Sequence, residues 1–198
     1  MKKVLLALFT LALCFSSLFA NEAAVKQAII RNIKQMSQGK FAESLSSYTT
    51  DFVGIDLDKN EKTYYKDEVL AAKAMDGNHP LEFMVVVYRI ENGKEPNAQE
   101  LKALRAMTQT AEFKKEYSNI CKYIVDRAKK LGELELKTIK FISVKVDGNT
   151  AIAITEYKAY DSSDTDLKSI VQKRQTIKLR KVNGVWKFYE TATKKISR

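Results

Sequence analysis

Acidic and tyrosyl side chains are the groups of this chain best able to move protons. Glu156 and Tyr157 are adjacent in an alternating run, VDGNTAIAITEYKAY. Because successive side chains of a strand point to opposite faces, one of the two must face the inside of a curved sheet. A carboxylate buried there would have a raised pKa and could act as a base, and Asp56 is a further weak candidate. Alternatively, Glu156 pairs with Arg174 or Lys178 on the outer face, which the many basic residues of these strands favour.

Histidine and glycine patterns point away from metal, nucleophilic and phosphate-binding chemistry. The only histidine, His79, lies in a turn beside Pro80, where a surface role is the simpler interpretation. A single histidine cannot build a histidine-rich metal site, and it is not accompanied by a Ser-His-Asp or Cys-His arrangement. The seven glycines are scattered at turns, without a phosphate-binding spacing. We therefore expect no metal ion, no cofactor and no assigned catalytic residue.

Aromatic side chains are the candidates for binding a ligand. Tyr48, Tyr64, Trp186 and Phe188 could line a pocket for an apolar or ring-containing molecule. Trp186 and Phe188 are two residues apart and share one face of the last predicted strand, where they would fill the hollow of a curved sheet. Ordinary core or sheet-face packing is the alternative for most of these rings.

The last third of the chain predicts four antiparallel strands in a meander. Asp147–Asn149 separates two β-branched runs, and Asn183 and Gly184 separate the last two. Both are hairpin signals, and Asn-Gly supplies the positive φ angles of a type I′ turn. The apolar alternation slips between Phe141 and Ile142, which predicts a β-bulge there.

The segment that follows residue 20 predicts helices and then a short strand pair. Val25, Ile29, Ile33 and Met36 recur at helical spacing, which is typical of one buried stripe. Gly39 can end this helix in a left-handed conformation. A short second helix through FAESLSSY and two short strands around VGIDLD and TYY follow.

Residues 66–132 read as a largely helical insertion. We expect helices over Lys66–Met75, over Leu81–Ile90 and after Pro96, where Asn97 and Glu100 have the spacing of a capping box. MVVVY alone would also suit a buried strand, but its polar flanks favour a helix. A last helix is predicted over Ala111–Leu131, ending at Gly132.

The N-terminus is typical of a secretory signal peptide. Lys2 and Lys3 precede an apolar run over Val4–Phe15, and the Ser16–Ala20 stretch then leads into polar Asn21. We expect cleavage after Ala20 and a single domain over residues 21–198, exported to the periplasm or secreted. Acylation at Cys14 or an uncleaved anchor are the alternatives.

The cysteine content and the net charge limit which disulfides and which partners are possible. Removing residues 1–20 leaves one cysteine, Cys121, at an apolar helical position, so the fold cannot depend on an internal disulfide. A buried structural thiol is the main interpretation; a reactive thiol or an intermolecular disulfide are the alternatives. The net charge of +10 and the run KRQTIKLRKV favour anionic surfaces as partners, but a plain solvated sheet face explains them equally well. No nucleic-acid partner is expected for an exported protein.

Three segments carry a resemblance to a known superfamily: FAESLSSYTTDF, VDGNTAIAITEY and LRKVNGVWKFYE. They resemble the helix-to-turn segment, the central hairpin and the final hairpin of nuclear transport factor two-like proteins. This superfamily is also called SnoaL- or ketosteroid-isomerase-like and has a cystatin-like cone. The resemblance implies an α+β fold in which a curved antiparallel sheet of about four to six strands wraps on the N-terminal helices. The insertion at 66–132 departs from it.

Three functions remain open, the first two implied by the resemblance and the third by the basic residues. The first is an exported, non-enzymatic domain that binds a small apolar ligand or a protein partner through the mouth of the cone. The second is an isomerase- or hydratase-like enzyme with a carboxylate inside the cone, because enzymatic members use such proton carriers. The third is an envelope-associated module that binds anionic surfaces. Two copies could also pair through the sheet face to form a homodimer.

Overall fold

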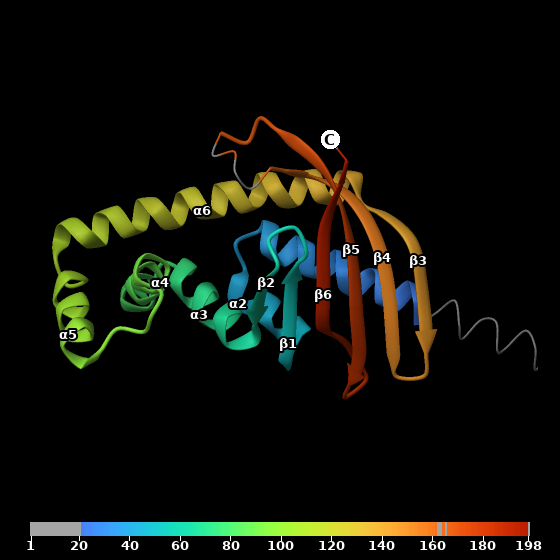
Figure 1. Cartoon of the computed structure of the whole chain (residues 1–198), viewed down its shortest axis with the longest axis horizontal. Coiled ribbons are helices and arrows are strands. Elements are labelled where there is room, and N and C mark those ends of the chain that lie inside the picture. The colour runs from blue at the N-terminus through green and yellow to red at the C-terminus, as the bar shows by residue number, and fades with distance from the viewer. Residues whose placement is uncertain (1–20, 162–163, 165, 198) are drawn as a thin grey trace, which may run out of the picture.

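A curved six-stranded sheet with helices against its hollow face forms the body of the protein (Figure 1). The computed structural model describes residues 21–161, 164 and 166–197. The expected signal peptide and Cys14 lie outside these residues. Among the described residues, no helix has both the length and the apolar character needed to cross a membrane.

Helices and strands follow the predicted order. The N-terminal helix covers residues 21–37 of the described chain. The later elements are α2 (Phe41–Ser44), the 3-10 helix η1 (Leu45–Ser47), β1 (Tyr48–Asp56), β2 (Glu61–Tyr64), α3 (Tyr65–Met75), α4 (Pro80–Asn92), α5 (Ala98–Met107), α6 (Ala111–Thr138), β3 (Lys140–Asp147), β4 (Thr150–Tyr160), β5 (Ile170–Val182) and β6 (Val185–Ser197). The predicted α+β class with a helical insertion is confirmed.

The strands lie in the order β2-β1-β6-β5-β4-β3. Four of the neighbouring pairs are antiparallel, as expected, but β1 runs parallel to β6. The sheet is therefore mixed rather than purely antiparallel. The parallel pair joins residues as far apart in the chain as Tyr48 and Phe188, and no turn signal in the sequence specifies it.

The local backbone features predicted for the last strands are present. Asn183 and Gly184 have φ angles of 51° and 79°, as a type I′ turn requires. The β3–β4 register shifts between Phe141 and Ser143, so the predicted bulge at Ile142 is confirmed.

The core lies between the N-terminal helix and the hollow face of the sheet. Val25, Ile29 and Ile33 of the helix are buried against strand residues that include Ile177 and Leu179. Removing such side chains from water stabilises the fold by about 1.5–3 kcal/mol each. The rings of Trp186 and Phe188 belong to the same cluster and are 4% and 3% exposed. The helical stripe therefore covers the concave face.

The insertion forms an arm that extends away from the sheet (Figure 1). Helices α4 and α5 lie in the arm, and α6 runs from the arm back to the sheet. Asn97 and Glu100 form the predicted capping box at the start of α5, where Asn97 Oδ1 accepts from the backbone N–H groups of Gln99 and Glu100 at 2.9 and 3.0 Å.

The predicted end of α6 at Gly132 is wrong, because the helix continues to Thr138. Gly132 is buried in mid-helix, where a Cβ atom would lie 2.3 Å from Cβ of Ser37. A glycine here lets α6 approach the N-terminal helix closely instead of ending the helix.

Candidate functional site

A cavity of about 490 Å³ lies on the hollow face of the sheet. Its walls come from the N-terminal helix, α3, the C-terminal part of α6 and the strands β1, β2, β4, β5 and β6. Ile29, Phe52, Leu131 and Phe188 are among its apolar residues. Helix α6 approaches the N-terminal helix closely where Gly132 meets Ser37, and residues of both helices line the cavity.

Among the carboxyl groups of the cavity, that of Glu135 in α6 has the largest shift in pKa. Burial raises the pKa of its carboxyl group to about 7, and the ammonium group of Lys173 partly opposes this shift. None of the described residues forms a hydrogen bond or an ion pair with this carboxylate. A carboxyl group that titrates near neutral pH can both accept and donate a proton there.

Two tyrosine hydroxyl groups share the cavity with Glu135. Burial raises the pKa of Tyr157 far above its usual value, with Glu135 adding to the effect and a hydrogen bond with Thr193 opposing it. Burial, together with the nearby Glu68 carboxylate, raises the pKa of Tyr48 to about 12. Both hydroxyl groups stay protonated at neutral pH and can donate hydrogen bonds.

The Tyr48 hydroxyl group is held in place by the N-terminal helix. It donates to Asn32 Oδ1 at 3.3 Å, and Asn32 is itself buried. The Tyr48 ring lies between two others, with its centroid 4.5 Å from that of Phe52 and 5.4 Å from that of Phe188. An aromatic corner therefore forms one side of the cavity.

Three further charged residues border the cavity: Asp56, Glu68 and Lys173. Burial, with the adjacent Asp67 carboxylate, raises the pKa of Glu68. Asp56 Oδ1 accepts from the backbone N–H groups of Asp58 and Lys59 at 3.0 and 3.2 Å, so it also fixes the turn after β1. Lys173 is the one basic residue among the described residues that line the cavity.

The structure separates the adjacent pair Glu156 and Tyr157. Tyr157 faces the cavity, whereas Glu156 lies on the outer face and accepts from Arg174 Nε at 2.9 Å. Lys178, the other partner considered for Glu156, pairs with Glu190 at 2.8 Å. Of the predicted proton carriers, Tyr157 and Asp56 therefore border the cavity, and Glu156 does not.

The four aromatic ligand candidates occupy three different environments. Tyr48 and Phe188 lie on the cavity wall. Trp186 is buried in the core beside it, with the ammonium group of Lys181 5.1 Å from the centroid of its ring system. Tyr64 is 46% exposed at the end of β2, outside the cavity.

Glu135 was missed because the sequence predicted the helix to end three residues earlier. One signal could have found it: Ala128, Leu131 and Glu135 continue one face of α6 at helical spacing, and all three line the cavity. A carboxylate that takes an apolar position on a buried stripe is a candidate site residue.

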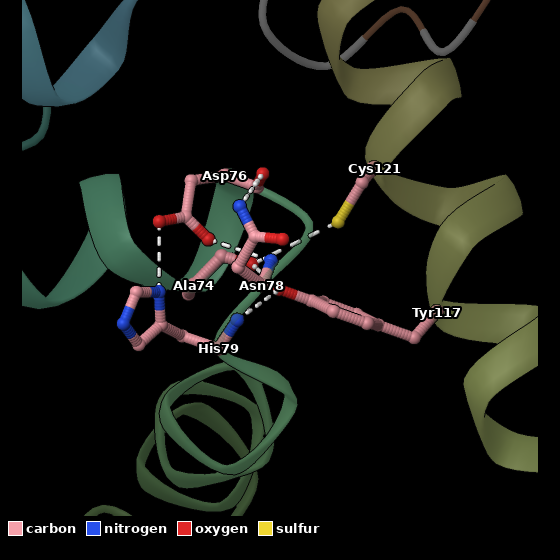
Figure 2. Close-up of polar contacts among 6 residues, drawn as sticks. All are labelled: Ala74, Asp76, Asn78, His79, Tyr117 and Cys121. Carbon is pink, nitrogen blue, oxygen red and sulfur yellow. Dashed lines mark hydrogen bonds and ion pairs between the residues drawn. The ribbon is translucent and has the colours of Figure 1, made fainter.

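A second polar cluster joins α3, α4 and α6 away from the cavity (Figure 2). The hydroxyl group of Tyr117 donates to the carbonyl of Ala74 at 3.0 Å and accepts from the backbone N–H of His79 at 3.3 Å. His79 Nδ1 lies 2.7 Å from Asp76 Oδ2, and the Cys121 thiol is buried beside the same carbonyl. The cluster holds α6 against the end of α3 and the start of α4. Among the described residues, no group of His, Cys, Asp and Glu side chains is arranged to hold a metal ion.

No protein-family model matches the sequence, and no curated protein matches it. Among solved structures, a ketosteroid isomerase-like protein from Erwinia carotovora atroseptica is similar at 13% identity and a TM-score of 0.46, covering 89% of this chain and 96% of its own. An NTF-2 like protein of unknown function from Shewanella oneidensis has 11% identity, a TM-score of 0.44 and coverages of 86% and 96%. An NTF2-like protein with a cystatin-like fold from Novosphingobium aromaticivorans has 9% identity, a TM-score of 0.48 and coverages of 93% and 87%.

These structural neighbours are ketosteroid isomerase-like and NTF2-like proteins. The three sequence motifs described above resemble segments of the same superfamily. At these identities the likeness concerns the fold alone, and no activity passes from them to this chain.

Proposed function

We propose that this protein binds a small, largely apolar molecule in the cavity between the sheet, the N-terminal helix and α6. The observation that carries the proposal is the cavity itself, about 490 Å³ in volume and walled in part by aromatic and aliphatic side chains. Ligand sites are typically concave, mostly apolar hollows of this size with a few polar groups inside.

The polar groups of the cavity would orient the bound molecule. The hydroxyl group of Tyr157 can donate a hydrogen bond, and Glu135 can accept or donate one near neutral pH. The Tyr48 hydroxyl group gives its proton to Asn32, so toward a ligand it can accept a hydrogen bond. The hydrogen bond to Asn32 already fixes the Tyr48 hydroxyl group, so its oxygen is positioned as an acceptor before the ligand arrives. Such pre-positioned groups reduce the entropy that binding must offset.

Proton transfer is a second candidate function, and one observation favours it. The pKa of Glu135 is about 7, which is near the value at which a general base is most effective at neutral pH. Glu135 would remove an acidic C–H proton from a bound molecule, while a tyrosine hydroxyl group stabilises the resulting oxyanion.

The test is the binding of N-phenyl-1-naphthylamine, a neutral apolar fluorescent probe, to the full mature chain. We expect its fluorescence to rise on binding. Ala128→Trp, which places an indole in the cavity, should abolish this rise. Ala103→Trp on the exposed surface of α5 is the matched control and should leave it unchanged.

Equal binding of the probe by the Ala128→Trp variant, or no binding by the natural chain, would contradict the proposal. Mass spectrometry of a molecule that the purified protein retains then separates the two candidates. A ligand recovered unchanged supports binding alone, whereas deuterium exchange at its acidic C–H position, lost in Glu135→Gln, supports proton transfer.

We also propose that the protein acts after export. The support is the charged and apolar pattern of residues 1–20. Mass spectrometry of the N-terminus of the protein from its own cells tests this, since cleavage after Ala20 predicts a mature chain that begins at Asn21.

A further inference from the structure

We propose that the molecule bound in the cavity is an organic cation, with an apolar body that carries a protonated amine or a quaternary ammonium group. The inference rests on the proposed binding function and specifies its ligand class. It comes from three observations: the sign of the charge inside the cavity, the aromatic rings there, and a largely buried carboxylate that has no hydrogen-bond or ion-pair partner among the described residues.

The charge of the cavity is opposite to that of the whole protein. The chain carries a formal net charge of +10, yet the cavity wall holds three carboxylates, Asp56, Glu68 and Glu135, and one basic residue, Lys173. Charges inside a concave, partly desolvated site act over longer distances than solvated surface charges. The cavity therefore attracts cations and repels anions, although the protein as a whole attracts anions.

Aromatic rings supply a second attraction for a cation. Tyr48 lies between Phe52 and Phe188, with ring centroids 4.5 and 5.4 Å apart, and all three rings border the cavity. The negative face of an aromatic ring attracts an ammonium group, and the same rings bury the apolar body of a ligand. An alkyl or aryl ammonium ion uses both properties of this corner.

Glu135 provides the position for the charged group. Its carboxylate forms no hydrogen bond or ion pair with a described residue, and Lys173 acts on it only at a distance. Burying an unpaired carboxylate is costly, and a cation beside it would remove this cost. A neutral ligand would leave the carboxylate without a partner, and an anionic ligand would raise the cost.

Binding of a cation must also respond to pH. An ammonium group next to Glu135 favours its ionised form, so binding releases a proton when the free carboxyl group is protonated. Affinity for a permanently charged ligand should therefore increase as the pH rises through the titration of Glu135. The other titratable and charged groups that line the cavity with this carboxylate are Tyr48, Asp56, Glu68, Tyr157 and Lys173. The two tyrosine hydroxyl groups stay protonated across this range, because burial raises their pKa values.

The experiment compares a cation with a neutral ligand of the same shape and with a smaller aromatic anion. Benzyltrimethylammonium, its neutral carbon isostere neopentylbenzene and the anion phenylacetate each compete with N-phenyl-1-naphthylamine for the mature protein. We expect the cation to bind at least about tenfold more tightly than the isostere near pH 8, and phenylacetate to bind most weakly. We also expect the affinity of the cation to fall several-fold when the pH is lowered to about 6.

Two variants test the assignment of the charged position. Glu135→Gln keeps the shape and removes the charge, so it should weaken binding of the cation about tenfold or more and leave neopentylbenzene unaffected. Glu156→Gln removes a carboxylate from the outer face and should change neither affinity.

The outcomes separate the inference from the function on which it rests. If neopentylbenzene binds as tightly as the cation, or if Glu135→Gln does not reduce the preference for the cation, the inference is overturned and the apolar binding site stands. Failure of N-phenyl-1-naphthylamine itself to bind overturns both.

Discussion

Glu135 occupies a position of α6 where the helical spacing favours an apolar side chain. Its neighbours on that face, Ala128 and Leu131, line the same cavity, and the burial that suits them raises the pKa of the carboxyl group to about 7. A group kept in an unfavourable environment without a partner lowers stability, and such positions concentrate at functional sites. The residue therefore links stability directly to pH.

The expected pH dependence follows from the two pKa values of Glu135. Its ordinary pKa is 4.5, and in the folded protein it is about 7, so the folded state holds the proton more tightly than the unfolded chain does. The stabilisation that the folded state gains from this tighter proton binding is fully present below pH 4.5 and is lost as the pH rises through 7. The loss is at most about 3 kcal/mol, because partial exposure to solvent weakens the effect.

Glu135→Gln should remove most of this loss. In urea unfolding, we expect the variant to be more stable than the natural chain near pH 8, by about 1–3 kcal/mol, and similar to it near pH 4.5. Glu156→Gln is the control: it breaks the ion pair with Arg174 and should give no gain at either pH. Parallel stability curves for Glu135→Gln and the natural chain would contradict this account of the carboxyl group.

At the scale of elements, α6 connects the arm to the cavity. Its N-terminal half carries Tyr117 and Cys121 of the cluster that joins the arm, and its C-terminal half carries Leu131 and Glu135 of the cavity wall. The helix reaches both because Gly132 lets it pass close to Ser37 of the N-terminal helix. The position of the cavity wall therefore depends on one close contact between helices.

Gly132→Ala tests this contact. Alanine in place of glycine within an exposed helix stabilises it by about 1 kcal/mol, because alanine has the higher helix propensity. Here the new Cβ would lie 2.3 Å from Cβ and 3.1 Å from Cα of Ser37, so the helices must separate. We expect a net destabilisation of about 1–3 kcal/mol in thermal or urea unfolding, together with weaker binding of the fluorescent probe.

A double variant shows whether the clash causes the effect. Ser37→Gly removes the nearer of the two atoms, so the combination with Gly132→Ala should be more stable than the sum of the single changes predicts. Strict additivity would show that Gly132 acts through something other than contact with Ser37.

On the scale of the whole molecule, the protein consists of a body built on the sheet and a helical arm (Figure 1). The body buries its apolar side chains between the sheet and the N-terminal helix, and residues such as Ala153 and Leu179 are fully buried. By contrast, α4 contains no buried residue although much of its sequence, PLEFMVVVYRIEN, is apolar. Segments with few buried contacts open at a lower free energy than the rest of a protein.

Tyr117→Phe should loosen the arm without affecting the body. The change leaves the carbonyl of Ala74 and the backbone N–H of His79 without their shared partner (Figure 2), at a cost of about 1–3 kcal/mol for groups that stay buried. In native-state hydrogen exchange, we expect faster exchange of the α4 amides and unchanged exchange in β5. Tyr123→Phe, on the exposed side of the same helix, is the control and should have little effect.

The sequence alone determined the features that depend on a few neighbouring residues. Asn183 and Gly184 predict a type I′ turn, Asn97 and Glu100 predict a capping box, and the slip in alternation near Ile142 predicts a bulge; all three are present. The stripe through Val25, Ile29 and Ile33 likewise predicts the face of the N-terminal helix that is buried. In each case, the backbone conformation or the apolar face follows from residue types a few positions apart.

Only the tertiary structure decided which distant segments meet. It pairs β1 in parallel with β6, extends α6 past Gly132, and thereby places Glu135 beside Tyr48 and Tyr157. It also places Glu156 on the outer face of the sheet and leaves Tyr64 outside the cavity, where the residue is 46% exposed. The reason is physical: such contacts depend on how whole faces pack and on how close two helices can approach. No short stretch of sequence contains that information.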